Sequence, residues 1–232
     1  MTVNQDGAVP SSQVAPTVPS SPANIGQLSL DDQIPIFRAA LTRNCALTKV
    51  LQGACELDLP NWYLAAGAVT QTVWNSVTGQ HPETGIDDYD IVYFDDSDLS
   101  WEAEDVAIKR GDKLFQEMGL GCKVEIRNQA RVHLWYADKF GVPCPEYQST
   151  EQAIDAWTSN TAMIGVRLDK TGKWSIYAPV GLSDMFNLVV RPNALIATRQ
   201  AYERKIVRWK KYWPGLTIHP WPEGRVILPG GT

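Results

Sequence analysis

The stretch Thr84–Asp95 reads TGIDDYDIVYFD, and it predicts a strand entered through acidic residues. The β-branched and aromatic run at 91–94 follows a glycine and an acidic loop, which is the pattern of a short strand. Side chains alternate between the two faces of a strand, so Asp88 and Asp90 point to the same face. Adjacent carboxylates repel each other unless a cation lies between them. Mg²⁺ is a suitable cation, because it prefers oxygen ligands and keeps coordination sites for water and substrate phosphates.

The same Asp-x-Asp pair also fits a solvated acidic turn that happens to precede a strand. Between His81 and Ile108 there are ten acidic residues and no Lys or Arg. Most of this acid is explained by solvation and by a helix that begins after Ser100, where acidic side chains favour the first turn. Asp88 and Asp90 lie before that helix, so the capping explanation does not cover them.

Composition and length favour one folded domain, or a domain with an appendage. The chain has 232 residues, of which 44% are hydrophobic, and a formal net charge of −5, which argues against a protein that coats nucleic acid. The four cysteines show neither a C-x-x-C motif nor zinc spacing, so we interpret them as reduced thiols in a cytoplasmic protein. No apolar run reaches transmembrane length, and no signal peptide is visible.

Residues 1–28 are rich in Pro, Ser and Thr and show no periodicity, which predicts a disordered tail. The folded domain is expected at 29–232, with a core at about 58–140 and a C-terminal extension at about 150–215. Within it, the pattern predicts one bent or two short helices from Ser29 to about residue 57. It also predicts a strand pair at 161–168 and 174–177, a short helix at 181–186, a helix at 194–213 and an irregular end from Pro214.

A glycine turn between a strand and a helix predicts a possible anion site. Trp62–Ala66 has the pattern of a buried strand, Gly67-Ala68 follows, and Val69 and Val73 then fall on one helical face. The free N–H groups and the positive dipole end of such a helix face an anion, and glycine allows close approach to the backbone. A lone glycine in this position also has a purely structural interpretation, and the sequence leaves both open.

A second strand offers a third carboxylate. In Cys122–Arg127 the apolar side chains alternate with Lys123, Glu125 and Arg127. Glu125 between two basic residues is typical of a surface ion pair. If this strand neighbours the Asp-x-Asp strand, Glu125 instead joins Asp88 and Asp90. Asn128-Gln129 is then expected to open a helix that carries Arg131 and His133.

Four stretches together resemble the bacterial nucleotidyltransferase-like family, within the DNA polymerase β nucleotidyltransferase superfamily. The resemblance extends over roughly residues 30 to 215, and it is carried by the segments 67–75, 88–95, 124–133 and 178–186. It implies an α+β fold, in which a small mixed β-sheet is flanked by helices. It also implies a metal-dependent transfer of an NMP group from an NTP to a hydroxyl acceptor, which is RNA, a protein or a small molecule.

The resemblance also implies the roles of individual residues. The catalytic and metal-binding carboxylates are Asp88, Asp90 and Glu125, which would hold Mg²⁺ or Mn²⁺. The residues expected to bind the nucleotide are Gly67, Ala68, Gln71, Asn128 and Arg131. The chain departs from the family at Ala68, which offers no hydroxyl to a phosphate, and at Thr70-Gln71, where the family often has Arg-Asn.

Two alternative functions remain open from the sequence. The departures at the glycine turn suit a non-catalytic nucleotide-binding module. An Asp-x-Asp motif also binds the metal and diphosphate in GT-A glycosyltransferases, although the sequence before residue 88 offers only one strand and one helix for a nucleotide domain.

The predicted helix at 194–213 carries six basic residues against a single acid, Glu203. We hypothesise that Arg199, Arg204 or Arg208 borders the same cleft as the aspartates, with Arg131 beside Glu125. The alternative is a helix that packs elsewhere and keeps its charges in water.

Overall fold

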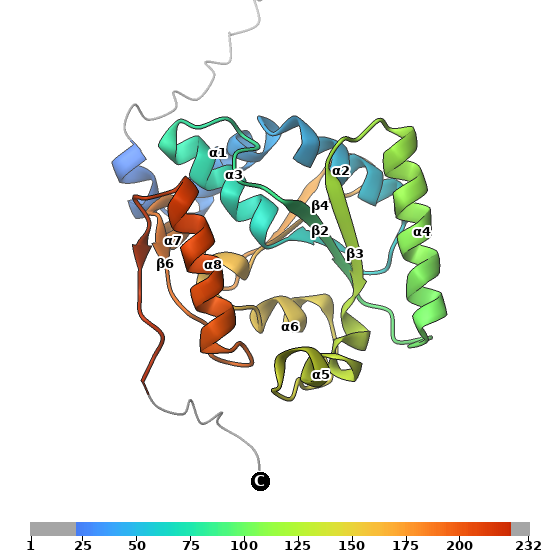
Figure 1. Ribbon diagram of the computed structural model, residues 1–232. Coiled ribbons are helices and arrows are strands. Elements are labelled where there is room, and N and C mark those ends of the chain that lie inside the picture. Colours follow the sequence, from blue (N-terminus) through green and yellow to red (C-terminus); the bar gives the residue numbers. More distant parts are fainter. Residues whose placement is uncertain (1–21, 224–232) are drawn as a thin grey trace, which may run out of the picture.

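The computed structural model describes residues 22–223. Its main sheet has five strands in the order β3-β2-β1-β4-β5 (Figure 1). These strands are β1 (Tyr63–Ala65), β2 (Asp88–Tyr93), β3 (Lys123–Asn128), β4 (Gly165–Leu168) and β5 (Trp174–Tyr177). Strands β2 and β3 pair in parallel and the other neighbours pair antiparallel, which confirms the expected mixed sheet in an α+β fold.

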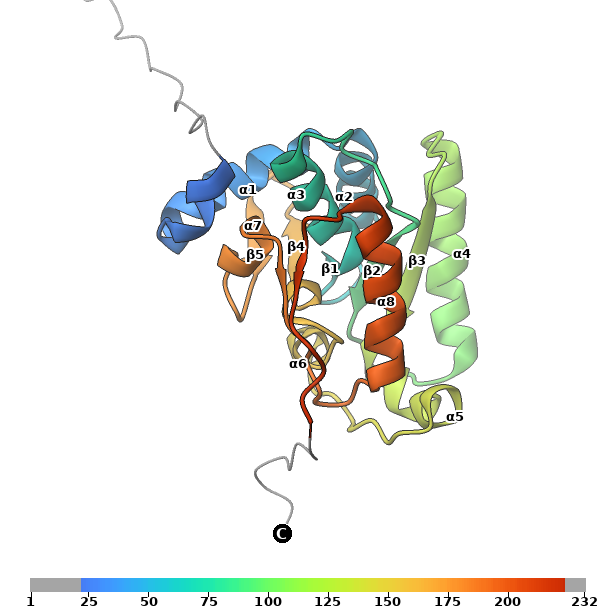
Figure 2. The same cartoon turned by 60° about the vertical axis from the view of Figure 1, so that its left-hand side comes forward.

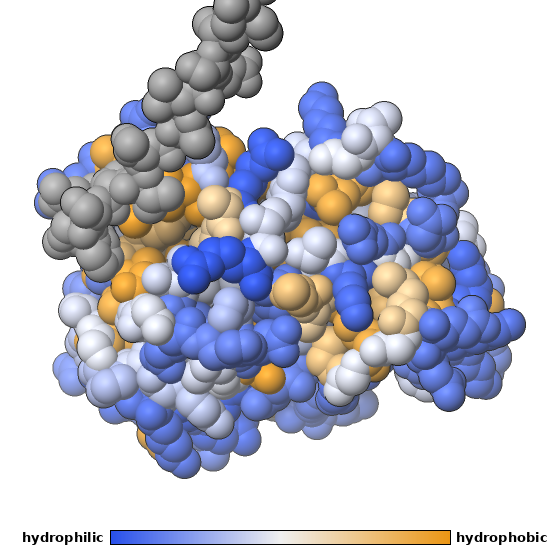
Figure 3. Space-filling view, turned by 90° about the horizontal axis from the view of Figure 1, so that it is seen from above, coloured by the Kyte–Doolittle hydropathy of each residue, from blue (hydrophilic) through white to orange (hydrophobic). Residues whose placement is uncertain are grey.

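One face of the sheet carries the core. Tyr89 and Ile91 point to this face with Ile126, and all three are buried in the main apolar cluster. Helices α1 (Leu30–Thr42), α2 (Cys45–Leu57) and α4 (Trp101–Glu117) supply the apolar side chains that cover it. Seen from above, hydrophilic residues dominate the outline of the molecule, and hydrophobic ones show in smaller patches between them (Figure 3).

Side-chain caps begin these helices where the sequence predicts. Ser29 Oγ accepts from the amide of Asp32 at 3.2 Å, and Ser100 Oγ accepts from the amide of Ala103 at 3.2 Å. Asn44 Oδ1 accepts from the amide of Leu47 at 2.9 Å, so the segment before residue 57 forms two helices rather than one bent helix. Each cap satisfies an amide that the first turn leaves without an intrahelical partner.

The opposite face of β1 and β2 looks toward α8 (Arg199–Tyr212), with α5 (Tyr136–Phe140) and α6 (Thr150–Asp155) near one end of α8 (Figure 2). Helix α3 (Gly67–Thr78) begins directly after β1 and packs against both α1 and α8. The contact between α3 and α8 is aromatic, because the ring centroid of Trp74 lies 5.2 Å from those of Trp209 and Trp213.

The structure corrects the expected boundary of the N-terminal tail. Pro22–Gln27 forms the 3-10 helix η1, Ile25 is only 7% exposed within the main core, and Gly26 packs directly against Asn187. The side chain of Gln33 donates to the carbonyl of Ile25 at 3.1 Å. The segment from residue 22 is therefore part of the folded domain, and residues 1–21 lie outside the described part of the chain.

Three further boundaries differ from expectation. The strand predicted from Thr161 begins only at Gly165, because Asn160–Ala162 forms the 3-10 helix η3. The helix expected after β3 is the 3-10 helix η2 (Gln129–Leu134), followed by the short α5. Beyond Pro214, β7 (Thr217–Ile218) pairs in parallel with β6 (Val189–Val190), which follows α7 (Ser183–Phe186); residues 224–232 lie outside the described chain.

Candidate active site

Three carboxylates converge on the face of the sheet that looks toward α8. Asp88 and Asp90 project from β2, and the parallel register places Asp90 beside Glu125 of β3. Directly paired residues of neighbouring strands point to the same face. One oxygen from each carboxylate lies within 4.8 Å of the others. The expected convergence of these three residues is therefore present in the structure.

Charge is not balanced at Asp90. Burial raises the pKa of the Asp90 carboxyl to about 7, and the neighbouring charges of Asp88 and Glu125 add to the increase. Lys205 and Lys123 act in the opposite direction but do not cancel it. A divalent cation would supply the missing positive charge, and oxygen ligands of this kind suit Mg²⁺ or Mn²⁺.

Glu125 also makes the surface ion pairs that its sequence neighbours predict. The Lys123 ammonium donates to Glu125, lies 4.0 Å from Asp88, and holds the pKa of the Glu125 carboxyl below its usual range. Arg127 Nη2 lies 3.7 Å from the same carboxylate. The Lys123 side chain is 62% exposed, and an exposed ion pair of this kind contributes little to stability. The two interpretations of Glu125 are therefore compatible.

A polar cavity of about 200 Å³ adjoins Asp88 and Asp90, and we call it the phosphate cavity. Gly67, Thr70 and Gln71 line it from the first two turns of α3. Ala66, just before this helix, has φ = 52° and ψ = −124°, a conformation that L side chains rarely adopt. This sharp turn lets α3 start at the end of β1, so the first turn of α3, whose amides lack intrahelical partners, borders the cavity.

The other wall of the phosphate cavity comes from α8. Lys205, Arg208 and Trp209 line the cavity together with Asp88 and Asp90. Arg208 forms an ion pair with Asp87, and its Nη2 donates to the carbonyl of Gly85 over 3.4 Å. The predicted position of Arg208 at the aspartate cleft is confirmed. Arg199 pairs instead with exposed Glu203, and neither Arg199 nor Arg204 lines a cavity beside the carboxylates.

Gln71 connects the two walls. With its amide oriented to suit its neighbours, Gln71 donates to the carbonyl of Gly85 at 2.9 Å. Its oxygen accepts from Arg208 Nη2 at 3.1 Å and from the Trp209 indole at 3.3 Å. The residue that departs from the family pattern therefore positions an arginine from a distant helix.

Lys205 is the cation that sequence reasoning missed. It lines the cavities on both sides of Asp90, and although part of the side chain reaches solvent, burial of its ammonium group lowers its pKa. The signal available in the sequence was its spacing, because residues at i and i+3 share one side of a helix. That spacing places Lys205 beside Arg208, but it does not tell which side faces the carboxylates.

A second cavity of about 300 Å³ lies on the Glu125 side of Asp90, and we call it the aromatic cavity. Trp135, Tyr136 and Phe140 from α5 and its preceding residue line it, with Trp157 beyond α6. No local sequence pattern indicates this cavity, because its walls come from several segments that lie far apart in the chain.

Three residues expected to bind the nucleotide do not line either cavity: Ala68, Asn128 and Arg131. Ala68 is fully buried in the core behind the turn. Asn128 accepts from the amide of Asp95 at 3.1 Å and donates to its carbonyl at 2.7 Å, which ties the end of β3 to the loop after β2. The structure therefore places Ala68 in the core and gives Asn128 a role in holding the loop after β2.

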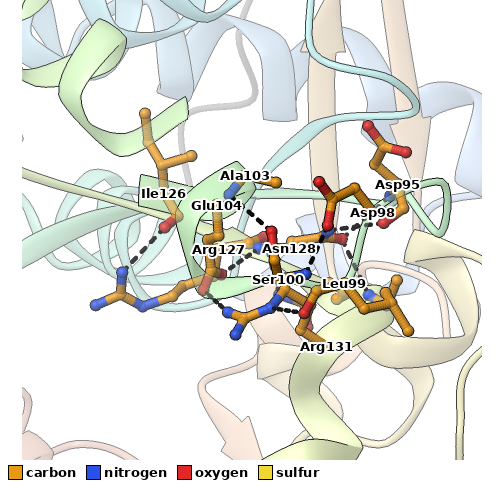
Figure 4. Close-up of polar contacts among 12 residues, drawn as sticks. Asp95, Asp98, Leu99, Ser100, Ala103, Glu104, Ile126, Arg127, Asn128 and Arg131 are labelled. Carbon is orange, nitrogen blue, oxygen red and sulfur yellow. Dashed lines mark hydrogen bonds and ion pairs between the residues drawn. The ribbon is translucent and has the colours of Figure 1, made fainter. Parts of the chain in front are cut away.

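Arg131 belongs to a buried polar network rather than to the wall beside Glu125 (Figure 4). Its guanidinium forms an ion pair with Glu104, which is 2% exposed, and donates to the carbonyl of Leu99 at 2.8 Å. Glu104 in turn accepts from the amide of Asn128 at 2.8 Å. The network joins α4 to η2, and the hypothesis that Arg131 lies in the active-site wall is wrong.

Comparison with known proteins agrees with this geometry. A family model described as nucleotidyltransferase matches residues 52–218. The chain belongs to the nucleotidyltransferase family. A structure solved by NMR and described as revealing a CCA-adding enzyme head domain matches with a TM-score of 0.65 and 22% identity, over 85% of this chain and 100% of the other. That likeness shows the fold. No curated protein matches the sequence significantly.

Membership of the nucleotidyltransferase family indicates an enzyme that acts on a nucleotide. None of the helices between residues 22 and 223 is both long enough and apolar enough to cross a membrane.

Proposed function

We propose that this protein is a metal-dependent nucleotidyltransferase that moves an NMP group from an NTP to a hydroxyl acceptor. The observation that carries the proposal is the convergence of Asp88, Asp90 and Glu125 beside a polar cavity. The basic side chains of Lys205 and Arg208 line the same cavity. Membership of the nucleotidyltransferase family supports the same reaction class.

The three carboxylates fit a divalent cation. All the donor atoms are oxygens, and their spacing allows one cation to reach all three. The pKa of Asp90 is raised by burial and by repulsion from Asp88 and Glu125, and a cation would offset both effects. Asp88, Asp90 and Glu125 would hold Mg²⁺ or Mn²⁺. The bound cation would lower the pKa of the acceptor hydroxyl and neutralise charge that develops on the transferred phosphate.

The chain's own residues contribute position and electrostatics. Amides at the start of α3, beginning with Gly67, face the phosphates of the NTP, and the absence of a side chain at Gly67 allows close approach. Lys205 and Arg208 offset the negative charge of the leaving pyrophosphate from the opposite wall. Gln71 keeps Arg208 in place. No covalent intermediate with the protein is needed.

These contacts account for the positions near the glycine turn at which the chain departs from the family pattern. Thr70 does not offer its hydroxyl to a phosphate, because it donates to the carbonyl of Thr161. Cations on α8 take the place of a basic residue near the glycine turn, which supports catalysis over a non-catalytic binding module. The GT-A alternative has no support from residues 22–87, where the only strand is the three-residue β1.

The test is incubation of the protein with each α-labelled NTP, Mg²⁺ or Mn²⁺, and a cell extract. We expect transfer of label to one fraction of the extract, and loss of transfer in Asp88→Asn. The matched control is Asp96→Asn, which changes an exposed aspartate outside both cavities. NTP binding without transfer in any fraction would favour the non-catalytic module. A cytoplasmic location stays a prediction, which cell fractionation tests.

A further inference from the structure

The aromatic cavity differs in chemistry from the phosphate cavity, although the two share Asp90. Aromatic and aliphatic side chains make up most of its wall, and the ring centroids of Tyr136 and Phe140 lie 4.6 Å apart. Its volume of about 300 Å³ is at the lower end of the range for small-molecule sites. Such a wall binds the body of a ligand through apolar contact and not through phosphate recognition.

The carboxylates divide between the two cavities in a way that gives the reaction a direction. Asp88 lines only the phosphate cavity, Glu125 lines only the aromatic cavity, and Asp90 lines both. In phosphoryl transfer the attacking and leaving oxygens lie roughly in line on opposite sides of the phosphorus. If pyrophosphate leaves toward Arg208 in the phosphate cavity, the attacking hydroxyl must approach from the Glu125 side.

We propose that the aromatic cavity is the acceptor site, and that the acceptor is a small hydroxyl-bearing molecule with an apolar or aromatic body and an anionic group. This inference rests on the proposed nucleotidyl transfer. The acceptor oxygen forms a bond to the α-phosphorus, and the bond from this phosphorus to the bridging oxygen breaks. Its electron pair leaves with pyrophosphate, and the hydroxyl proton passes to water.

The expectation that the acceptor carries an anionic group comes from the position of Lys139. Its ammonium lies 5.3 Å from the ring centroid of Trp135 and 5.4 Å from that of Phe140, at the rim of the cavity. Among the described residues it has no carboxylate partner within ion-pair distance. A cationic ligand is disfavoured, because Lys139 already faces two of the rings. With Arg127 and Lys205, three cations also outnumber the two carboxylates of this cavity, which the proposed metal would engage. Thr158 Oγ1, also at this cavity, makes no hydrogen bond to a described residue and is available to a polar group.

A small molecule fits these features better than the end of an RNA strand. RNA binding needs a track of cations that follows successive phosphates. On α8, however, Arg199 pairs with Glu203, and Lys210 donates to the carbonyls of Pro214 and Leu216. The chain as a whole carries a net charge of −5. Of the basic residues that remain on α8, Lys205 and Arg208 line the cavities, and Arg204 and Lys211 line neither of them.

The first experiment separates a cell extract into RNA, protein and molecules below about 1 kDa, the drug-sized range, before labelling with each α-labelled NTP and Mg²⁺. We expect label in the small-molecule fraction, resistant to ribonuclease and protease. Label confined to RNA or protein would overturn the acceptor inference and leave the proposed function standing. No label in any fraction, together with no stabilisation of the protein by Mg²⁺ and NTP, would instead refute the proposed function.

The second experiment tests the cavity itself with 8-anilinonaphthalene-1-sulfonate, a fluorescent probe with a planar apolar body and one sulfonate. Phe140→Ala removes part of the wall, and Ala201→Trp fills the cavity from α8. Phe140 is half-buried and lies outside the main apolar clusters, so its removal should spare the fold, which circular dichroism checks. Leu134→Ala, a change at an exposed neighbouring residue outside the cavity, is the matched control.

We expect at least a tenfold weaker affinity for the probe and a similar loss of the labelling rate in both cavity variants, while Leu134→Ala resembles the wild type. Stabilisation by Mg²⁺ and NTP should be unchanged in all three, because none alters the phosphate cavity. Lys139→Gln should lower the affinity for the probe, and Lys139→Arg should keep it close to that of the wild type. Wild-type probe affinity in folded Phe140→Ala and Ala201→Trp would overturn the inference, whether or not transfer is observed.

Discussion

The indole of Trp213, at the end of α8, donates a hydrogen bond to Asn75 Oδ1 of α3 over 2.9 Å, and both residues are fully buried. The bond joins the helix that starts at the glycine turn to the helix that carries Lys205 and Arg208. Gly85 passes against the same place with φ = 70°, where an added Cβ would come within 2.7 Å of the Trp213 ring. The two walls of the phosphate cavity are therefore held together at a packed polar contact some distance from the carboxylates.

Asn75→Ala should destabilise the protein by about 1–3 kcal/mol, because it leaves the buried Trp213 N–H without its partner. Asn75 also donates to the carbonyls of Pro82 at 3.0 Å and Thr84 at 2.9 Å, so the loop before β2 loses its anchors as well. Urea unfolding measures the change. Trp213→Phe keeps an aromatic ring and those loop contacts, although it shortens the ring, so it should cost less. An equal or larger loss in Trp213→Phe would show that ring size matters more than the hydrogen bond.

Arg131→Met should cost about 3–5 kcal/mol of stability, because it leaves the buried Glu104 carboxylate without its ionic partner. The affinity of the folded variant for Mg²⁺ and NTP should stay within about twofold of the wild type, since this side chain lines neither cavity. Chemical unfolding and NTP titration measure the two effects separately. A stable variant that has lost NTP binding would restore the interpretation of Arg131 as a nucleotide contact.

Gly67→Ala should weaken NTP binding by about tenfold, or about 1.4 kcal/mol, without unfolding the protein. The added methyl group would enter the phosphate cavity, and its nearest neighbour would be the flexible end of Gln71 at 3.2 Å. Isothermal titration with a non-hydrolysable NTP measures the affinity. Gly121→Ala is the matched control, because an added Cβ there meets nothing within 4 Å. Unchanged affinity in Gly67→Ala would mean that the phosphates bind elsewhere.

Asp90→Asn should raise the melting temperature of the metal-free protein at pH 8 by about 2–4 °C, the shift that 1 kcal/mol produces in a domain of this size. The pKa of Asp90 is about 7 in the folded protein and about 3.9 in an unfolded chain. The folded state therefore binds more protons between these values, and its stability falls as pH rises from about 4 to about 7.

Removal of this carboxylate should flatten that part of the pH profile and abolish stabilisation by Mg²⁺ or Mn²⁺. Thermal melts from pH 4 to pH 8, with and without the metal, measure both effects. A variant that melts below the wild type at pH 8 in the absence of metal would show that Lys205 and Lys123 already balance the charge of Asp90.

Truncation to residue 29 should lower the melting temperature by several degrees relative to a chain that begins at residue 22. The missing segment contains Ile25, whose buried side chain contributes about 1.5–3 kcal/mol, and the carbonyls of Ile25 and Leu28 that accept from Gln33 at 3.1 Å. Differential scanning calorimetry of the two proteins makes the comparison. Equal melting temperatures would return the domain boundary to residue 29.

The carboxylate cluster of the site was predictable from the sequence because it depends on local geometry. Alternation along a strand places Asp88 with Asp90 on one face and Tyr89 on the other, and it places Glu125 opposite Ile126. Only one further condition was needed, that β2 and β3 be neighbours, and the family resemblance supplied it. Helix starts at Ser29 and Ser100 were predictable for the same reason, since a cap acts over three residues.

Tertiary structure alone decided which distant side chains reach the carboxylates. Lys205 and Arg208 face Asp90 because aromatic packing of Trp209 and Trp213 on Trp74 sets the rotation of α8 about its axis. Arg131 turned inward because Glu104, 27 residues away, is buried and needs a cation. Local period in the sequence predicts most helices and the faces of the strands. The aromatic cavity exists only where separated segments pack together, and no local pattern encodes their relative placement.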